Sequence, residues 1–292
     1  MKIAIGIPAY NEEKNIAATI IKLGKITQNI IVCDDGSNDL TSEIAEKLKV
    51  VVVKHRKNLG YGAAIKTIFN TARDMDVDIL ITFDGDGQHR VEDIEKIILP
   101  LKEDKADIVI GSRFLEKVEN IPKYRKIGIK AITSLTNINT KSKISDAQSG
   151  FRGYSKKVIK NLIPSDFGMG ISTEILIKAS KLNFRIIEVP IVVLYNGDTS
   201  THDPVSHGIS VILSTMKYTS IERPLTFYGI PGIVFFGIGL FFLIWTIQVF
   251  TDFGEIITNI ALVSIGGIFL GVLLMTTGII LYTTVSVMRE SK

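Results

Sequence analysis

Short apolar runs alternate with longer amphipathic stretches over the first half of this 292-residue chain. The apolar runs have the length of β-strands and cover residues 3–7, 30–33, 50–53, 79–83 and 108–110. Stretches with helical spacing of apolar positions lie between them, near residues 13–23, 41–48, 61–75 and 91–101. Strands that alternate with helices are typical of βαβ units. The pattern therefore predicts an α/β domain built on a mainly parallel sheet.

The second half of the chain is less regular and then becomes strongly apolar. A basic helix-like segment is expected at 123–137, a helix at 172–182 and strands at 185–193. Residues 225–250 and 256–288 carry no charge, and each run exceeds the roughly 20 residues that a helix needs to cross a bilayer. Because only five residues separate the two runs, we expect a transmembrane helical hairpin. A hairpin buried in a soluble protein is the alternative, which two such adjacent runs disfavour.

The charges that flank the apolar runs predict an orientation. The basic flanking residues are Lys217, Arg223, Arg289 and Lys292. The connecting loop carries only Asp252 and Glu255, and positive flanks stay cytoplasmic. We therefore expect a cytoplasmic domain over residues 1–204, an amphipathic juxtamembrane helix over 205–224 and two spans within 225–288. Helical spacing of Val205, Ile209 and Met216 favours a helix on the bilayer surface, and packing on the domain is the alternative.

Composition adds little to this outline. The hydrophobic content of 46% is high for a soluble protein, and the excess lies in the two apolar runs. The net charge is +4 for the whole chain and +5 for residues 1–224, which suits an anionic membrane face but is too weak to indicate nucleic acid. The first residues read as a strand, so no signal peptide is expected. The single cysteine, Cys33, lies in an apolar run and is interpreted as a small core residue.

The apolar run at 79–83 ends in Asp84-Gly85-Asp86. Ligands of an open parallel sheet bind at the carboxyl ends of its strands, and side chains two apart on an extended backbone face the same way. Asp84 and Asp86 can therefore converge on one Mg²⁺ or Mn²⁺, which prefer carboxylate oxygens and often hold phosphates. A simple Asp-Gly turn is the alternative.

Other predicted strands also run into polar or glycine-rich segments, at residues 8–13, 34–37 and 58–62. Several such segments at one sheet edge favour a ligand site. No phosphate-binding loop of the Gly-x-x-x-x-Gly-Lys type occurs, and Asn58-Leu59-Gly60-Tyr61-Gly62 lacks the third glycine of a dinucleotide fingerprint. ATP hydrolysis and nicotinamide chemistry are therefore disfavoured.

Six motifs in order carry a resemblance to a known family. They are Pro8-Ala9-Tyr10-Asn11-Glu12, Asp34-Asp35-Gly36-Ser37, Asn58-Leu59-Gly60-Tyr61-Gly62, Asp84-Gly85-Asp86 with Gln88-His89, Gly111-Ser112-Arg113, and Asp146-Ala147-Gln148-Ser149-Gly150-Phe151-Arg152. Over residues 3–193 the chain resembles the polyprenyl-phosphate glycosyltransferases of glycosyltransferase family two, of the dolichyl-phosphate mannose or glucose synthase type. The resemblance implies a GT-A fold and a membrane-anchored hexosyltransferase.

The resemblance also implies roles for individual residues. Nucleotide binding is expected from Pro8, Tyr10, Glu12, Asp35, Asp84 and Gly85. Asp84, Asp86 and Gln88 would hold Mg²⁺ or Mn²⁺, and the phosphate of the acceptor would meet Arg113, Arg125, Ser149 and Arg152. The catalytic set is then Asp86, Arg113, Ser149 and Arg152. For Asp146 and Glu174, a structural role in pairing or capping is at least as plausible as a tuning role.

The expected partners are a nucleotide sugar, with GDP-mannose or UDP-glucose favoured, a polyprenyl or dolichyl phosphate, and the bilayer; a homo-oligomer stays open. A lipid phosphate is already ionised near pH 7, because the second pKa of a phosphate monoester is about 6. Such an acceptor needs no strong general base, and in-line displacement would invert the anomeric carbon.

Two other functions are weighed against this one. A polysaccharide or glycolipid synthase would use a hydroxyl acceptor and a general base. Such processive enzymes typically carry Gln-x-x-Arg-Trp, whereas the one tryptophan here, Trp245, lies inside a predicted span. The second alternative is a non-catalytic scaffold or lipid-translocation partner that retains the fold, and the intact acidic and basic motifs disfavour it.

The chain departs from the mannose-synthase pattern at residues 194–202, a polar loop without the usual arginine. His202 and Arg185 are the candidates to replace that charge. A lone histidine in a polar loop is, however, more often an ordinary surface residue. The departure leaves the donor sugar and the closure of the loop open.

Overall fold

The computed structural model describes residues 1–115, 123–193 and 213–290, with gaps at 214–215, 217–218 and 222. It divides into two units, Met1–Thr215 and Met216–Lys292, which we describe separately. In the first unit the strands are β1 (Ile3–Ala9), β2 (Ile30–Asp34), β3 (Val51–Lys54), β4 (Ile79–Thr82), β5 (Ile108–Ser112), β6 (Arg152–Ser155) and β7 (Ile186–Pro190). The helices are α1 (Ile16–Leu23), α2 (Thr41–Lys47), α3 (Tyr61–Asp74), the 3₁₀ turn η1 (Val91–Asp93), α4 (Ile94–Lys102), α5 (Lys123–Asn139), α6 (Lys156–Asn161) and α7 (Ile171–Lys181).

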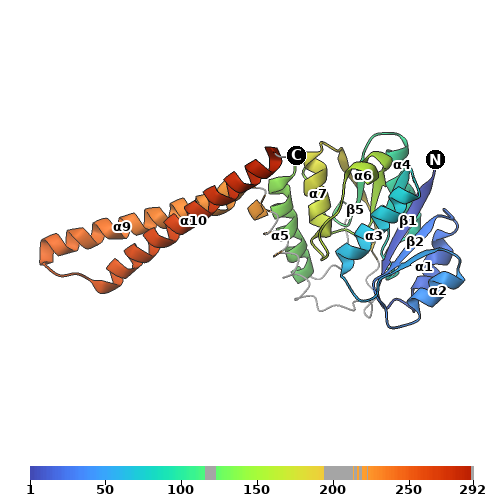
Figure 1. The fold of residues 1–292 in the computed structure, drawn as a ribbon, viewed down its shortest axis with the longest axis horizontal. Coiled ribbons are helices and arrows are strands. Elements are labelled where there is room, and N and C mark those ends of the chain that lie inside the picture. The colour runs from blue at the N-terminus through green and yellow to red at the C-terminus, as the bar shows by residue number, and fades with distance from the viewer. Residues whose placement is uncertain (116–122, 194–212, 214–215, 217–218, 222, 291–292) are drawn as a thin grey trace. The chain divides into compact units, whose positions relative to one another are not determined.

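The seven strands form one sheet in the order β3-β2-β1-β4-β6-β5-β7. Figure 1 shows the ribbon of this unit, with the strands β1, β2 and β5 and the surrounding helices labelled. Neighbouring strands are parallel except where β6 is involved, since β6 runs antiparallel to both β4 and β5. This mixed, mainly parallel sheet with helices on both faces confirms the predicted α/β class and its GT-A-like architecture. The sequence pattern did not predict β6, because the segment before it reads only as a glycine-rich turn.

The antiparallel direction of β6 determines which loop lies at the edge of the sheet where ligands are expected to bind. Thr82, the last residue of β4, pairs with Arg152, the first residue of β6. Ile110, close to the carboxyl end of β5, pairs with the same arginine. The loop that precedes β6 therefore lies at the edge where the parallel strands β1, β2, β4 and β5 end.

Two hydrophobic clusters cover the faces of the sheet. Because side chains alternate along a strand, Ala4 and Leu80 pack into one cluster with α3, α6 and α7, whereas Ile5 and Ile81 pack into the other with α1, α2 and α4. Cys33 is fully buried in the first cluster, as expected of a core residue.

The second unit contains the π-helical turn η2 (Leu225–Gly229) and the helices α9 (Ile230–Phe253) and α10 (Thr258–Glu290). Two segments, Leu225–Phe253 and Thr258–Val287, are long and apolar enough to cross a membrane. Only 6% and 11% of their most apolar stretches are buried in the structure, so they do not resemble the core helices of a soluble protein. Glycines at the contact between α9 and α10 allow close packing: a Cβ on Gly239 would lie 2.4 Å from the backbone nitrogen of Ile268. The expected hairpin is thus present.

Candidate active site

Asp84 lies just beyond the end of β4, and two side chains bind its carboxylate. Tyr61 Oη donates to Asp84 Oδ1 over 3.3 Å, and His89 Nε2 lies 3.2 Å from Oδ2. Burial by itself would raise the pKa of Asp84, but the contacts with His89, the hydrogen bond from Tyr61 and the positive charge of Arg113 outweigh it and lower that pKa. Asp84 is therefore an ionised carboxylate at neutral pH, with 27% of its side chain exposed.

Gly150 explains how the loop before β6 approaches this carboxylate. A Cβ at Gly150 would lie 2.8 and 2.9 Å from the two carboxylate oxygens of Asp84 and 2.7 Å from Tyr61 Oη. The Thr82 hydroxyl donates to the Gly150 carbonyl over 2.6 Å and fixes the loop in this place. The third motif, through Tyr61, and the sixth motif, through Gly150, thus lie against Asp84 of the fourth motif at the end of β4.

The end of β1 meets the same loop. Pro8 belongs to β1 and Tyr10 directly follows it. A Cβ on Gly85 would lie 3.6 Å from the Pro8 carbonyl oxygen and 3.8 Å from Glu12 Cγ. The structure therefore brings the predicted nucleotide-binding residues of the first and fourth motifs together.

Asp86 follows Asp84 in a tight turn, in which Gln88 donates its backbone N–H to Asp86 Oδ1 over 3.0 Å. Negative charge accumulates here. Burial raises the pKa of Glu12, and the charges of Asp86, Asp39 and Asp84 raise it further. Such a cluster of acidic groups is expected to attract a cation.

The donor set fits Mg²⁺ or Mn²⁺ held together with a diphosphate. Among the described residues, no group of three or more His, Cys, Asp or Glu side chains could hold a metal ion. Mg²⁺ commonly binds through one or two carboxylates plus substrate phosphates and water. Asp84 and Asp86 lie on one turn and supply that minimal set. Asp84 is ionised and lies directly against Gly150.

Asp35 has a different set of partners from the one expected of a nucleotide ligand. Its carboxylate accepts backbone N–H groups of Leu59 at 3.0 Å and Gly60 at 2.8 Å, and His55 Nδ1 lies 2.6 Å away. The side chain is 5% exposed. Asp35 therefore fixes the start of α3, whose first residue is Tyr61, and so supports the site through the backbone.

Arg113 directly follows β5 and is held by Asp146. Its Nε donates to Asp146 Oδ2 over 2.6 Å and its Nη2 to Oδ1 over 2.7 Å. Asp146 is fully buried, and backbone N–H groups of Ser145 and Asp146 bind Glu188 in turn. A guanidinium anchored in this way is pre-organised for an anion, and its charge acts on Asp84 across the site. For Asp146, the pairing role left open by the sequence is the one observed.

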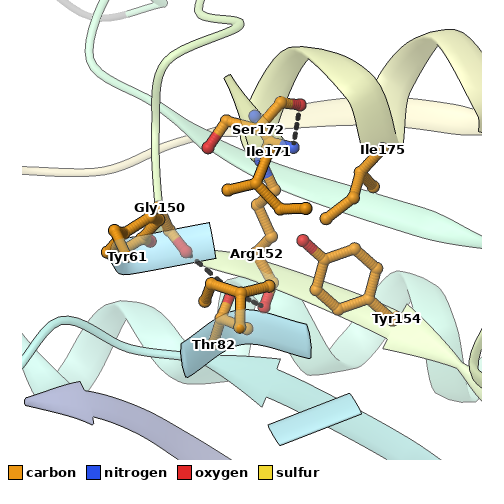
Figure 2. A pocket seen from close by; sticks show the side chains of 9 residues that line it. Tyr61, Thr82, Gly150, Arg152, Tyr154, Ile171, Ser172 and Ile175 are labelled. Carbon is orange, nitrogen blue, oxygen red and sulfur yellow. Dashed lines mark hydrogen bonds between the residues drawn. The ribbon is translucent and has the colours of Figure 1, made fainter. Parts of the chain in front are cut away.

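The Arg152 side chain is more deeply buried than is expected of a residue that binds a phosphate. It is 1% exposed and donates to the carbonyls of Ala147, Ser149 and Ser172 over 2.7–2.8 Å. Figure 2 shows it between Thr82 and the α7 residues Ile171 and Ser172. The adjoining cavity holds about 10 Å³, roughly one water molecule, so no sugar or phosphate fits there. These contacts favour a role in shaping the loop.

The remaining predicted residues are placed as follows. Ser149 Oγ is buried and has no hydrogen-bond partner in the described part of the chain. Glu174 accepts the backbone N–H groups of Ser165 and Asp166 and so holds the loop before α7, a structural role. The side chain of Arg125, the loop 194–202 with His202, and most of the expected helix 205–224 lie outside the described residues.

One suggestion from the sequence is wrong. Arg185 binds Asp104 and Asp107 immediately before β7 and β5. Because these strands are parallel, that is the edge opposite to Arg113. Arg185 therefore cannot replace the arginine missing from the loop 194–202.

Sequence reasoning missed the two side chains that contact the Asp84 carboxylate, Tyr61 and His89. In the sequence, Tyr61 belongs to a motif considered above only for its glycines, and no role is predicted there for His89. The positions of these residues could have indicated them. Tyr61 is the first residue of a helix at the edge of the sheet where ligands are expected, and His89 follows the acidic turn.

Comparisons with known proteins show what the sequence and the fold are similar to. Residues 4–163 match the family model of glycosyl transferase family 2. The chain is 36% identical over 229 residues to the UDP-N-acetylglucosamine–dolichyl-phosphate N-acetylglucosaminyltransferase of Methanococcus voltae, covering 71% of this chain and 89% of that protein. It is 34% identical over 202 residues to the dolichol-phosphate mannosyltransferase of Pyrococcus furiosus, covering 65% and 56%. The fold is similar to glucosyl-3-phosphoglycerate synthase from Mycobacterium tuberculosis in complex with Mn²⁺, UDP and glucosyl-3-phosphoglycerate, with a TM-score of 0.55, 20% identity, and 74% and 79% of the two chains covered.

Proposed function

Because the chain belongs to glycosyl transferase family 2, we propose that it transfers a single hexose from a nucleotide sugar to a dolichyl-type polyprenyl phosphate, with inversion at the anomeric carbon. The names of its relatives support this acceptor. The two apolar helices support a membrane location, and the basic flanks of the spans support a cytoplasmic domain.

The observation that carries the proposal is the placement of opposite charges at one sheet edge. Asp84 and Asp86 follow β4, and the Arg113 guanidinium follows β5, anchored by two short hydrogen bonds to buried Asp146. The diphosphate of the donor, held by a cation at Asp84 and Asp86, can thus be brought close to the phosphate of the acceptor, held by Arg113. A transferase with two phosphorylated substrates needs such an arrangement, because the substrates repel each other.

Each residue then has a defined task. Asp84 and Asp86, with Gln88, would hold Mg²⁺ or Mn²⁺, which when bound neutralises charge on the departing diphosphate. Pro8, Tyr10, Glu12 and Gly85 would bind the nucleoside, and Asp35, by fixing the start of α3, would support the contact of Tyr61 with Asp84. Arg113, with Ser149 and Arg125, would orient the lipid phosphate; Arg152 would shape their loop.

The chemistry requires no proton acceptor. A phosphate oxygen of the lipid forms the new bond to the anomeric carbon, while the bond from that carbon to the donor diphosphate breaks and the nucleoside diphosphate leaves. Both oxygens of Asp146 already bind Arg113, so this carboxylate is not available as a general base. A hydroxyl acceptor would need such a base, whereas an acceptor that is already ionised does not.

A matched pair of acceptors tests the proposal. The full chain in detergent is incubated with Mn²⁺, one of UDP-glucose, GDP-mannose or UDP-N-acetylglucosamine, and either a short polyprenyl phosphate or the polyprenol of equal length. We expect an acid-labile glycolipid with the phosphate alone and no product after EDTA treatment. Product with the polyprenol alone would favour the hydroxyl-acceptor alternative, and donor binding without turnover would favour the scaffold.

A further inference from the structure

The His89 ring is fixed on several sides next to Asp84. Its ring centroid lies 5.7 Å from that of Phe83 and 5.1 Å from that of Phe151, and both phenylalanines are buried. Its backbone forms an antiparallel bridge with Val193. With 8% of the side chain exposed, the imidazole has little freedom to leave the position in which Nε2 lies 3.2 Å from Asp84 Oδ2.

The surroundings of the two ring nitrogens determine where the proton lies. His89 Nδ1 is buried and has no hydrogen-bond partner among the described residues. A proton on Nδ1 would therefore be an unpaired buried donor, which is costly. It would also leave the lone pair of Nε2 facing a carboxylate oxygen in the neutral ring. The neutral imidazole with its proton on Nε2 avoids both penalties.

We propose that His89 is a positioning residue that donates its Nε2 proton to Asp84 and so aims the remaining lone pairs of this carboxylate at the divalent cation. This inference rests on the proposed function, in which Asp84 and Asp86 hold that cation. Each carboxylate oxygen can accept two hydrogen bonds or a metal and one hydrogen bond. His89 engages one oxygen and Tyr61 the other, so each keeps a lone pair for the metal. Hydrogen-bond partners of metal ligands commonly contribute 10- to 100-fold in metal affinity.

Two substitutions separate the hydrogen bond from the packing. His89→Phe keeps an aromatic ring between Phe83 and Phe151 but removes the donor, whereas His89→Gln places an amide donor near the position of Nε2. Binding of Mn²⁺ to the full chain is followed by electron paramagnetic resonance of the free ion, with UDP or GDP, whichever raises the wild-type affinity. We expect His89→Phe to weaken Mn²⁺ binding about 10- to 100-fold and His89→Gln to stay within about threefold of wild type.

Two results would overturn the inference: an Mn²⁺ affinity of His89→Phe within threefold of wild type, or a loss in His89→Gln as large as in His89→Phe. Melting temperatures are recorded for each variant, and His89→Met, which also packs well on aromatic rings, replaces the phenylalanine variant if that one does not fold. Asp86→Asn is the separate control for the proposed function. If it binds Mn²⁺ like wild type, the metal assignment itself fails, whatever His89 does.

Discussion

Replacing Asp146 with asparagine should uncouple Arg113 from its anchor without changing the shape of the side chain. Asp146 accepts Nε at 2.6 Å, Nη2 at 2.7 Å and the backbone N–H of Arg113 at 3.1 Å, and it is fully buried. In Asp146→Asn, the amide oxygen can accept one guanidinium N–H. The amide NH₂ then faces another donor, so one strong hydrogen bond and the counter-charge are both lost.

The expected cost follows from these contacts. Removing one partner of a buried ion pair costs about 3–5 kcal/mol. Arg113 keeps 14% side-chain exposure, so water can hydrate part of the guanidinium and we expect a loss near the lower limit, about 3 kcal/mol. For a domain of about this size, each kcal/mol lowers the melting temperature by roughly 2–4 °C, which gives a decrease of roughly 6–12 °C. The released arginine should raise the KM for polyprenyl phosphate at least about tenfold.

The same strand offers a matched control. Asp107 immediately precedes β5, as Arg113 immediately follows it, and Asp107 binds Arg185 through Nε at 3.2 Å and the backbone N–H at 2.8 Å. Asp107→Asn therefore removes the same charge from the opposite edge of the sheet. We expect a smaller loss of stability, because the Arg185 side chain is 48% exposed, and no change in the KM for the lipid.

Thermal unfolding and steady-state kinetics for both substrates, measured on both variants, provide the test. If Arg113 meets the acceptor phosphate, Asp146→Asn raises the lipid KM well beyond the donor KM. If both constants rise equally, or if Asp107→Asn affects the lipid KM as strongly, Arg113 is not the residue that meets the acceptor.

Three further predictions concern other parts of the chain. Burial acts to raise the pKa of Asp107, but its contacts with an arginine outweigh this and lower it below 3.8; its stabilising effect is therefore present above about pH 4. The difference in urea midpoint between wild type and Asp107→Asn should then be full at pH 6 and shrink as pH falls through the folded-state pKa; a constant difference would contradict this. Gly150→Ala would place a methyl group 2.8 Å from the Asp84 carboxylate, so turnover should fall at least about tenfold, and normal metal-dependent turnover would refute the contact. Gly239→Val should lower the thermal midpoint of the hairpin in detergent, because its Cβ meets Ile268; an unchanged midpoint would count against this packing.

Much of the fold could be predicted because its signals are local. The apolar run before Asp84 became β4, and the run around Cys33 became β2. The two uncharged runs became α9 and α10. In each case the period or the length of an apolar segment is sufficient, since both are properties of neighbouring residues. The sequence also indicated which strand ends carry ligand chemistry, because parallel strands end at one edge.

The site itself depended on contacts between residues far apart in the chain. Gly150 reaches Asp84 only because β6 runs antiparallel to β4, a register that no local pattern encodes. Arg152, expected at the phosphate, turns inward because backbone carbonyls of its own loop and of α7 surround it. The strands other than β6, the hairpin and the acidic turn at Asp84 follow from local patterns in the sequence. Which side chains contact that turn depends on the tertiary structure, because such partners are set by strand order and packing, and not by spacing along the chain.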